Sequence, residues 1–289
     1  MTAAGTIASI HRYPVKSMQG ETLDEVFVGT NGVAGDRAWA VRNEKRGGIQ
    51  GAKQIAGLMR CRARFLEEPA PDATVPIPEV TLSDGACFRA DDETAASKLS
   101  ADVRAEVTLW PLLPPEMQDH YRRLPPEDPE QDMGEALREM FGREPDEPIP
   151  DLARFPPDLF EYETPPGTYF DAFPLLLMSQ ASLDSMAAST PGSRFDVRRF
   201  RPNFLIDGAP GAGHPEFDWE GRHLEVGDAV LALEFRCPRC VMTTHAFDDL
   251  PKDPKVMRAL VRETGGNLGI YARVETPGKI SVGDAVVLR

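Results

Sequence analysis

Short stretches of alternating hydrophobic and polar residues, separated by turn-forming residues, fill the first 110 positions of the chain. This alternation is typical of half-buried β-strands, whose side chains point to opposite faces in turn. An Asp-Gly pair at 84–85 supplies the positive φ that a tight hairpin needs. One short helix is expected at 92–99, and the many short strands predict a small barrel or curled sheet. The expected strands and hairpin lie at 7–13, 23–28, 38–42 and 80–88.

A second regular pattern begins near residue 167, and it mixes strands with helices. Leu231, Leu233 and Phe235 form an alternating apolar run that predicts a half-buried strand. Ser179 precedes an expected helix, and serine is a preferred residue at helix N-termini. Together these patterns predict a β-rich domain with peripheral helices. The other expected strands lie at 175–178 and 203–206, and the expected helices at 181–188 and 253–263.

The stretch from 111 to 166 differs from both flanking parts in composition. It holds 13 of the 27 prolines, and residues 116–163 contain 15 Asp and Glu against 5 Arg. Proline prevents long helices and central strands, so a helix at 133–141 is the one regular element expected here. We expect a solvated and partly mobile connector or insertion. A docking surface for a basic redox partner is the alternative.

The fold class that these patterns predict is β-rich α+β, in three parts. Residues 1–110 form an N-terminal β-barrel-like domain, and 111–166 form the Pro-rich acidic connector or insertion. Residues 167–289 form a β-barrel domain with peripheral helices. A chain of 289 residues is long enough to bury a core in each of two domains.

Composition and charge narrow the class of protein. Hydrophobic content of 41% and charged content of 27% are those of a soluble globular protein. The net charge of −14 argues against nucleic acid as a partner. No apolar run approaches the length of a membrane span, and four Cys without framework spacing indicate a reducing compartment. We therefore expect a cytoplasmic protein that does not enter a membrane.

The clearest candidate chemistry is a Cys-x-x-Cys motif at the end of a predicted strand. Cys237 and Cys240 alternate there with Arg236 and Arg239. The thiolate is the nucleophile and metal ligand, and neighbouring Arg charges lower the pKa of a thiol. Cys240, which directly follows Arg239, is the stronger candidate for a reactive thiol.

Other interpretations of these cysteines fit less well. A structural zinc site needs four Cys or His ligands, and even with His245 no fourth ligand is evident. A thioredoxin-type motif precedes a helix, whereas residues 241–244 favour strand or loop. Burial as small apolar fillers suits Cys61 and Cys87.

The region around Cys240 resembles a known family. With Gly269–Val274 and Pro277–Asp284 it resembles the MOSC domain, the C-terminal domain of molybdenum cofactor sulfurases. Tyr13–Ser17 and Gly35–Arg37 are similar to the N-terminal β-barrel that accompanies this domain. Together the motifs resemble the amidoxime-reducing family, which includes mitochondrial members and bacterial relatives.

The resemblance implies a set of residues that bind the molybdenum cofactor, Mo-molybdopterin. A pterin phosphate needs Arg forks, a Lys or hydroxyls, and the matching motif positions supply them. Arg239 is grouped with this set because it lies beside Cys240. The expected cofactor-binding residues are Lys16, Ser17, Arg37, Arg201, Asn203 and Arg239.

The resemblance also implies the metal ligand and one acidic residue near it. Cys240 is expected to bind molybdenum through its thiolate, a soft ligand. Asp171 matches an acidic residue near the metal and is expected to be catalytic, although it could equally be an ordinary loop carboxylate. Where relatives have hydroxyl residues after this position, the chain has Ala172 and Phe173. The role of Cys237 stays open.

The activity implied by the resemblance is oxygen-atom transfer. The enzyme would reduce a small N-hydroxylated substrate, such as an amidoxime, hydroxylamine or N-hydroxypurine, and form water. Its electrons would come from a separate flavoprotein, ferredoxin or haem carrier. A carrier of the cofactor or of sulfur, without reductase activity, is the alternative function, and a cofactor-free interaction module is a third. Pyridoxal phosphate chemistry is disfavoured, because neither Lys16 nor Lys53 lies in a motif for a Schiff base.

Overall fold

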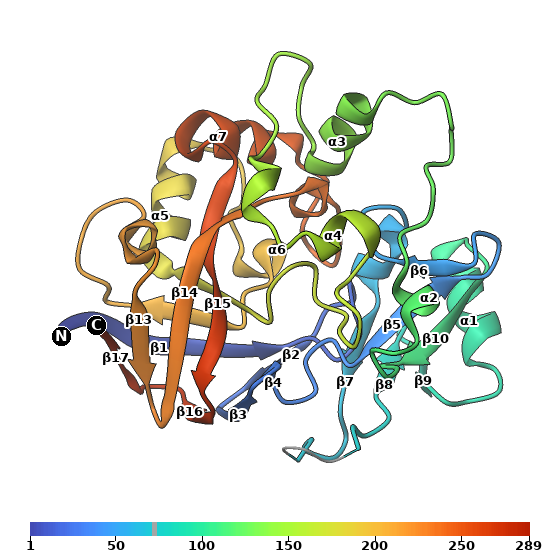
Figure 1. Ribbon diagram of the computed structural model, residues 1–289, viewed down its shortest axis with the longest axis horizontal. Coiled ribbons are helices and arrows are strands. Elements are labelled where there is room, and N and C mark those ends of the chain that lie inside the picture. The colour runs from blue at the N-terminus through green and yellow to red at the C-terminus, as the bar shows by residue number, and fades with distance from the viewer. Residues whose placement is uncertain (71–73) are drawn as a thin grey trace.

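A closed barrel is the main element of the computed structural model, which describes residues 1–70 and 74–289 (Figure 1). β1 pairs with β12 and closes the barrel, and β2 (Glu21–Leu23) extends the sheet beyond β1. β11 and β12 run parallel, whereas the other barrel pairs are antiparallel. In order around the barrel the strands are β12 (Phe204–Asp207), β11 (Leu175–Ser179), β15 (Asn267–Thr276), β14 (Ala229–Pro238), β13 (His223–Val226), β17 (Ala285–Leu288) and β1 (Thr2–Arg12).

Alternation along the strands fills the barrel interior. In β14 every second residue from Ala229 to Cys237 is buried, including the predicted Leu231, Leu233 and Phe235. Side chains from β1, β11, β12 and β17 meet Ala229, Leu231 and Leu233 in one apolar cluster, whereas Phe235 packs with Phe173. The predicted class, a β-rich fold with a β-barrel, is confirmed.

Helices cover the outside of the barrel (Figure 1). Ser179 Oγ accepts a hydrogen bond from Ser182 N at 3.1 Å and caps α5, as the sequence predicts. Gly265 ends α7 with a φ of 62°. Within 1–70 and 74–289 no helix is long and apolar enough to cross a membrane. The helices beside the barrel are α5 (Gln180–Ser189), α6 (Val197–Phe200), α7 (Pro254–Thr264), and the 3-10 helices η3 (Pro215–Trp219) and η4 (Val241–Thr244).

The sequence prediction for residues 241–244 is wrong, because they form the 3-10 helix η4 and not a strand or loop. The Thr243 hydroxyl donates to the Cys240 carbonyl at 3.0 Å, and the Thr244 hydroxyl donates to the Val241 carbonyl at 2.7 Å. These local hydrogen bonds outweigh the strand preference of Val and Thr, which depends on tertiary context.

The N-terminal part consists of three small sheets, of which two share a core of their own and the third packs into the barrel core. β5 lies between β10 and β6, and β8 lies between β7 and β9 in the predicted hairpin region. A third sheet joins β3 and β4 to β16, so this part is continuous with the barrel. The strands are β3 (Glu25–Gly29), β4 (Gly32–Val33), β5 (Trp39–Asn43), β6 (Gly48–Gln50), β7 (Arg62–Arg64), β8 (Glu79–Thr81), β9 (Cys87–Arg89), β10 (Val107–Pro111) and β16 (Gly278–Ser281), with helices η1 (Ala56–Arg60) and α1 (Ala95–Val103).

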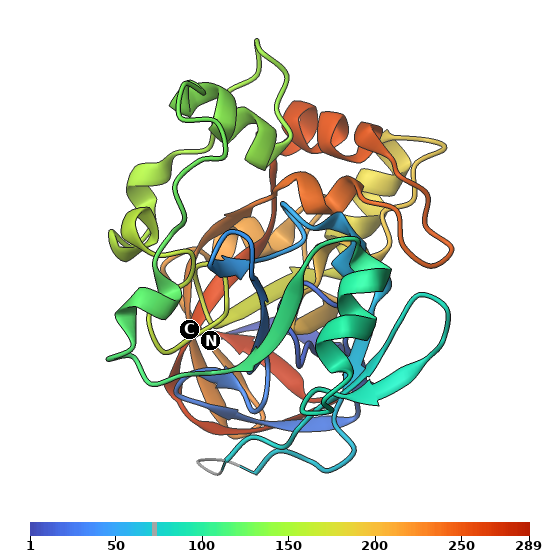
Figure 2. The same cartoon turned by 90° about the vertical axis from the view of Figure 1, so that its right-hand side faces the viewer.

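The acidic segment is more ordered than the sequence predicts. It contains α2 (Gln118–Tyr121), α3 (Met133–Phe141), η2 (Leu152–Arg154) and α4 (Asp158–Glu161), and α3 has its predicted bounds. Tyr121 is fully buried and Tyr162 is buried, so the expectation of a solvated loop is wrong for these parts. Proline limits the length of the helices, while the aromatic side chains still bury apolar surface. Figure 2 shows this segment in green along one side of the molecule, from β10 to α7.

The barrel core should dominate the stability of the protein. Leu231 is fully buried, so Leu231→Ala should lower the free energy of unfolding by about 2–5 kcal/mol. Val282 is 43% exposed, and Val282→Ala is the matched control, with an expected change within about 0.5 kcal/mol. Urea unfolding measures both. Equal losses in the two variants would contradict the assignment of Leu231 to the core.

Candidate cofactor site

A pocket of about 650 Å³, including space open to solvent, lies between the barrel and the N-terminal part. The structure brings all of the predicted site residues to its wall, although they come from distant parts of the sequence. Their roles stay predictions. They are Lys16, Ser17, Arg37, Asp171, Arg201, Asn203, Arg239 and Cys240.

Three of these residues adopt a backbone conformation that is rare outside glycine. Ser17, Arg37 and Arg201 have φ values of 70°, 49° and 56°, and they are three of the five non-glycine residues with positive φ in 1–70 and 74–289. Arg37 N donates to the Tyr13 carbonyl at 2.7 Å, and Arg201 N donates to the Val197 carbonyl at 3.1 Å. Such conformations persist only where the surrounding structure fixes them, and they concentrate at functional sites.

Two guanidinium groups share the ring of Tyr13. Arg201 lies 4.1 Å and Arg37 5.0 Å from the ring centroid. Burial, together with the charge of Arg37, lowers the pKa of Arg201 to about 10. Arg201 Nη1 donates to the Met18 carbonyl, but its buried Nη2 has no partner among the described side chains and backbone groups. A buried donor without an acceptor is costly, so this end of the pocket is suited to an anion.

Asn203 joins the two parts of the protein beside these arginines. Its Nδ2 donates to Asp36 Oδ2 at 3.1 Å, and its Oδ1 accepts from Leu176 N at 3.2 Å. Asp36 also forms an ion pair with Arg37 and accepts from Tyr13 N at 2.7 Å. The predicted cofactor residue Asn203 therefore already has a structural function.

Cys240 lies between the end of β14 and the start of η4, and it is partly exposed. Arg239, expected to act on Cys240, instead contacts Cys237, whose Sγ is 2.9 Å from its Nη1. Burial raises the pKa of the Cys237 thiol, although Arg239 and Tyr271 act in the opposite direction. Arg239 Nη2 donates to the Phe200 carbonyl at 2.6 Å, while its buried Nε has no partner in the part of the chain that is described. Cys237, whose role the sequence leaves open, therefore orients Arg239.

Asp171 lies between two lysines. Lys16 Nζ forms an ion pair with Asp171 Oδ1 and donates to the Tyr169 carbonyl at 3.0 Å, whereas Lys53 Nζ is 3.5 Å from Asp171 Oδ2. Burial favours a higher pKa for Asp171, but Lys16 and Lys53 outweigh it and hold the pKa well below its usual range. Asp171 is therefore ionised at neutral pH.

Sequence reasoning did not identify Lys53 as a neighbour of Asp171, because no motif surrounds it. The nearest signal is Gly51, where an added Cβ would lie 2.7 Å from Ser17 Oγ. This close approach brings the loop that carries Lys53 against the predicted Lys16-Ser17 pair. Such proximity depends on the fold and cannot be deduced from spacing.

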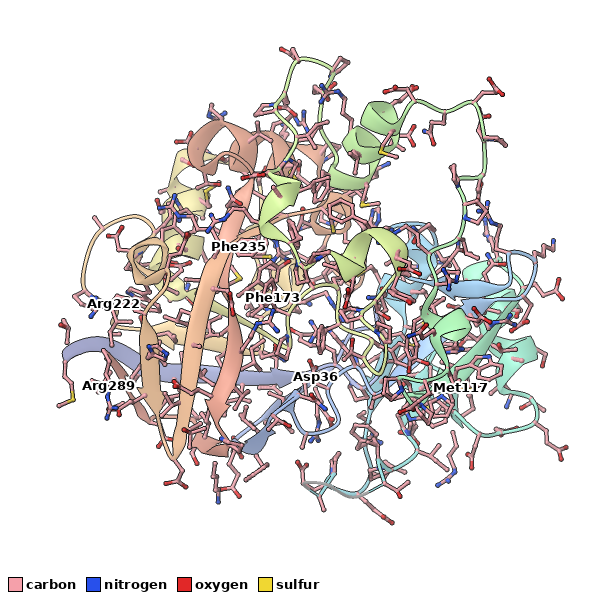
Figure 3. All side chains as sticks on the ribbon, viewed as in Figure 1. Asp36, Met117, Phe173, Arg222, Phe235 and Arg289 are labelled. Carbon is pink, nitrogen blue, oxygen red and sulfur yellow. The ribbon has the colours of Figure 1, made fainter. Side chains whose placement is uncertain are left out.

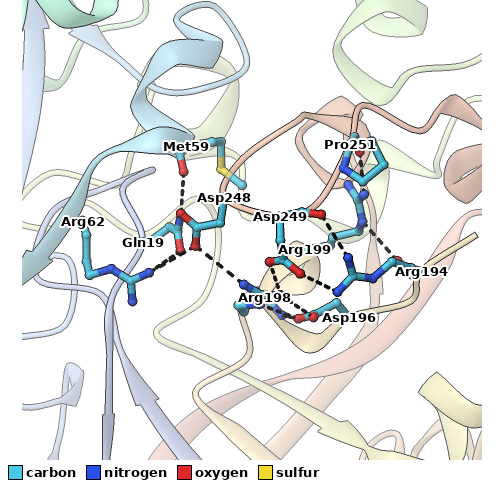
Figure 4. Close-up of polar contacts among 10 residues, drawn as sticks. All are labelled: Gln19, Met59, Arg62, Arg194, Asp196, Arg198, Arg199, Asp248, Asp249 and Pro251. Atoms are coloured by element: carbon cyan, nitrogen blue, oxygen red, sulfur yellow. Dashed lines mark hydrogen bonds and ion pairs between the residues drawn. The ribbon is translucent and has the colours of Figure 1, made fainter. Parts of the chain in front are cut away.

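The segment after Cys240 is held from several sides. Arg199 is buried, and it donates to the carbonyls of Thr243 at 3.1 Å, His245 at 3.0 Å and Pro251 at 2.7 Å. Met242 packs into the N-terminal core. Figure 4 shows the adjoining network of ion pairs. In it Asp248 Oδ2 accepts a hydrogen bond from Arg62 Nη2 at 3.1 Å and lies 3.6 Å from Arg198 Nη1. Arg198 in turn pairs with Asp196 and Asp249, and Arg194 with Asp249.

Aromatic side chains form the wall opposite the N-terminal part. Phe173 meets Phe235 edge-to-face with ring centroids 5.4 Å apart, and Figure 3 shows both beside the barrel strands. Phe173 also stacks on Tyr271 at 4.9 Å. Phe155 of the acidic segment packs on Phe235 at 5.3 Å, so this segment supports the wall from outside. Phe173 offers no hydroxyl where the family resemblance leads one to expect such residues.

Comparison with known families defines the class of protein. The family model of the MOSC domain matches residues 165–287, and that of the MOSC N-terminal beta barrel domain matches residues 4–101. The chain therefore belongs to the proteins that combine these two domains, and the predicted resemblance is confirmed.

The chain is homologous to the mitochondrial amidoxime-reducing components. It is 26% identical to component 1 of Homo sapiens over 98% of this chain and 83% of that protein. It is 32% identical to component 1 of Mus musculus over 42% of this chain and 38% of that protein. The YUAD protein from Bacillus subtilis, a solved structure, has 13% identity and a TM-score of 0.44, over 99% of this chain and 95% of that chain.

The ion pairs of Asp171 predict its titration. The pKa of Asp171 should lie below its ordinary value of about 3.9. Lys53→Gln should raise it, because one of the two neighbouring positive charges is removed. NMR titration of the side-chain carboxyl carbon of Asp171 measures this pKa in the wild type and in Lys53→Gln. The stabilisation from Asp171 is fully present above its unfolded-state pKa and is lost as pH falls through the folded value. A wild-type midpoint at or above about 3.9 would contradict the assigned ion pairs.

Proposed function

We propose that this protein binds the molybdenum cofactor in the pocket at Cys240 and reduces small N-hydroxylated compounds. One observation carries the proposal: buried guanidinium donors without partners in the described part of the chain lie in the same pocket as a partly exposed thiol. The donors are Arg201 Nη2 and Arg239 Nε. The MOSC domain match and the amidoxime-reducing homologues support it.

The residues of the pocket fit an anionic cofactor with a soft metal. Five cationic side chains and one carboxylate line it, which leaves an excess of positive charge for a phosphate. Arg37 and Arg201, stacked on Tyr13, would hold the phosphate, with Lys16 and Ser17 beside them. Cys240 would bind molybdenum through its thiolate, since soft sulfur ligands suit such metals.

The residues of the chain have distinct tasks in this proposal. The bound cofactor supplies two-electron oxygen-atom transfer. Arg199 fixes the segment that carries Cys240, and Cys237 orients Arg239. Asp171 stays ionised beside Lys16 and Lys53, so it acts as a fixed acceptor and not as a proton donor at neutral pH. Phe173 and Tyr271 cover the barrel side of the pocket.

The proposed partners follow from the reaction. The substrate is a small N-hydroxylated molecule, and the electrons come from a separate flavoprotein, ferredoxin or haem carrier. The cytoplasm is the proposed location. The proposed division of the chain is 1–110, 111–166 and 167–289, and the acidic segment is available to a basic electron donor.

The test is metal and pterin content of protein from a molybdate-supplied host that makes the cofactor. Cys240→Ser should lose molybdenum because its ligand is removed, and Arg201→Ala should lose it because the phosphate loses a donor. Cys87→Ser is the matched control, and it should keep wild-type molybdenum. Cys87 lies outside the pocket and is exposed, so the expectation that it is a buried apolar filler is wrong. Benzamidoxime reduction with an artificial electron donor measures turnover.

The outcomes separate the candidate functions. Molybdenum that disappears in both site variants, together with turnover in the wild type, supports the reductase. Molybdenum without turnover on several N-hydroxylated compounds would replace the reductase with a cofactor carrier. Absence of molybdenum from every preparation would overturn both the reductase and the cofactor carrier.

A further inference from the structure

Lys53 lies on a loop that is fastened to both halves of the pocket. The backbone N of Ala52 donates to Ser17 Oγ at 2.9 Å, and the Ala52 carbonyl lies 3.0 Å from His245 Nε2. Ser17 belongs to the N-terminal part, whereas His245 follows η4 and Cys240. The position of Lys53 is therefore fixed by the same contacts that form the site.

The ammonium groups of the two lysines beside Asp171 differ in the hydrogen bonds that they already donate within the protein. Lys16 is 5% exposed and uses its donors on Asp171 Oδ1 and the Tyr169 carbonyl. Lys53 is 19% exposed, and its ammonium donates no hydrogen bond to any residue in 1–70 or 74–289. Lys16 thus uses two of its donors within the protein, whereas the donors of Lys53 are free among the described residues.

The Lys53–Asp171 pair keeps unused hydrogen-bonding capacity on its solvent side. Lys53 Nζ and Asp171 Oδ2 are 3.5 Å apart, which is an ion pair but is longer than a good hydrogen bond. Asp171 is 47% exposed, whereas the pocket arginines Arg201 and Arg239 are only 7% and 8% exposed. The buried charges therefore face the proposed cofactor, and the Lys53–Asp171 pair faces whatever enters from solvent.

The charges of this pair are stable at neutral pH. Burial favours a lower pKa for Lys53, but Asp171, Cys240 and Glu163 outweigh it and raise the pKa. Lys53 is consequently a permanent donor and Asp171 a permanent acceptor. An ammonium has only donors and a carboxylate only acceptors, so the pair is complementary to a molecule with an adjacent acceptor and donor.

We propose that Lys53 and Asp171 are the residues that recognise the substrate. Lys53 donates a hydrogen bond to the oxygen of the N–O bond. Asp171 Oδ2 accepts a hydrogen bond from the amino group on the carbon that carries the N–O nitrogen. This inference rests on the proposed function, because it names the residues that select among N-hydroxylated compounds. It favours substrates of the amidoxime type, which carry both groups, over oximes that lack the amino group.

Benzamidoxime and benzaldoxime test the two contacts separately, because they differ in that amino group. Isothermal titration calorimetry on the protein as purified measures the affinity for each. Lys53→Gln should weaken binding of both compounds by about tenfold or more, as expected for loss of one charge-assisted hydrogen bond. Lys53→Arg should restore most of this affinity. Asp171→Ala should weaken benzamidoxime alone and so remove the preference over benzaldoxime.

Lys45→Gln is the matched control, because Lys45 is an exposed lysine of the same part of the chain and lies outside the pocket. It should bind both compounds like the wild type. Wild-type affinity in Lys53→Gln, an unchanged preference in Asp171→Ala, or no binding to the wild type would each overturn the recognition pair.

Molybdenum content of the same samples distinguishes this inference from the proposed function. Lys53 does not line the pocket beside the buried arginines, so Lys53→Gln should retain wild-type molybdenum while it loses affinity. Protein that contains no molybdenum but shows the expected binding pattern would overturn the proposed cofactor and keep the recognition pair. Loss of molybdenum in Lys53→Gln would instead place Lys53 in the cofactor site and overturn its assignment to the substrate.

Discussion

Burial of positive charge without matching carboxylates is the constraint on which the rest of the structure depends. Removing a charged group from water costs several kcal/mol unless it is paired or well hydrogen-bonded. Around this pocket, part of that cost is offset by backbone carbonyls, as at Arg199, and by an aromatic ring, as at Arg201 over Tyr13, while Arg37 has its ion pair with Asp36. Arg201 Nη2 and Arg239 Nε have no partner in 1–70 and 74–289, so these donors stabilise the protein only when an anion is present. The protein gives up stability at this site in exchange for a preformed anion pocket.

The barrel and the N-terminal part each supply half of this arrangement. The end of β14 and η4 carry Arg239 and Cys240, and α6 ends in the left-handed conformation of Arg201. The N-terminal part supplies Lys16 and the loop with Lys53, and the segment after Cys240 packs into the N-terminal core. Because the same residues join the two parts and line the pocket, the geometry of the site depends on how the two parts are fixed to each other.

Local signals in the sequence account for much of the fold, whereas the candidate site residues rest largely on the family resemblance. Alternation predicts β14, and caps predict α5 and α7, because these depend on neighbouring residues. Cys240 and the motif arginines are recognised through the family resemblance, and the structure brings them to one pocket. The closure of the barrel by β1 and the approach of Lys53 to Asp171 involve residues far apart in sequence, and no local pattern encodes them. The buried tyrosines of the acidic segment were missed because overall polarity and proline content concealed individual apolar contacts.

The pairing of β1 with β17 joins the two extremes of the chain in one sheet. Contacts of such long sequence separation form slowly, since the whole intervening chain must be organised first. During synthesis β1 emerges long before β17, so the barrel can close only after β17 has been made. The strands that carry the pocket therefore reach their final arrangement late in folding, and any group that binds there binds after this step. Until then the N-terminal strand presents an open edge that could pair with other chains.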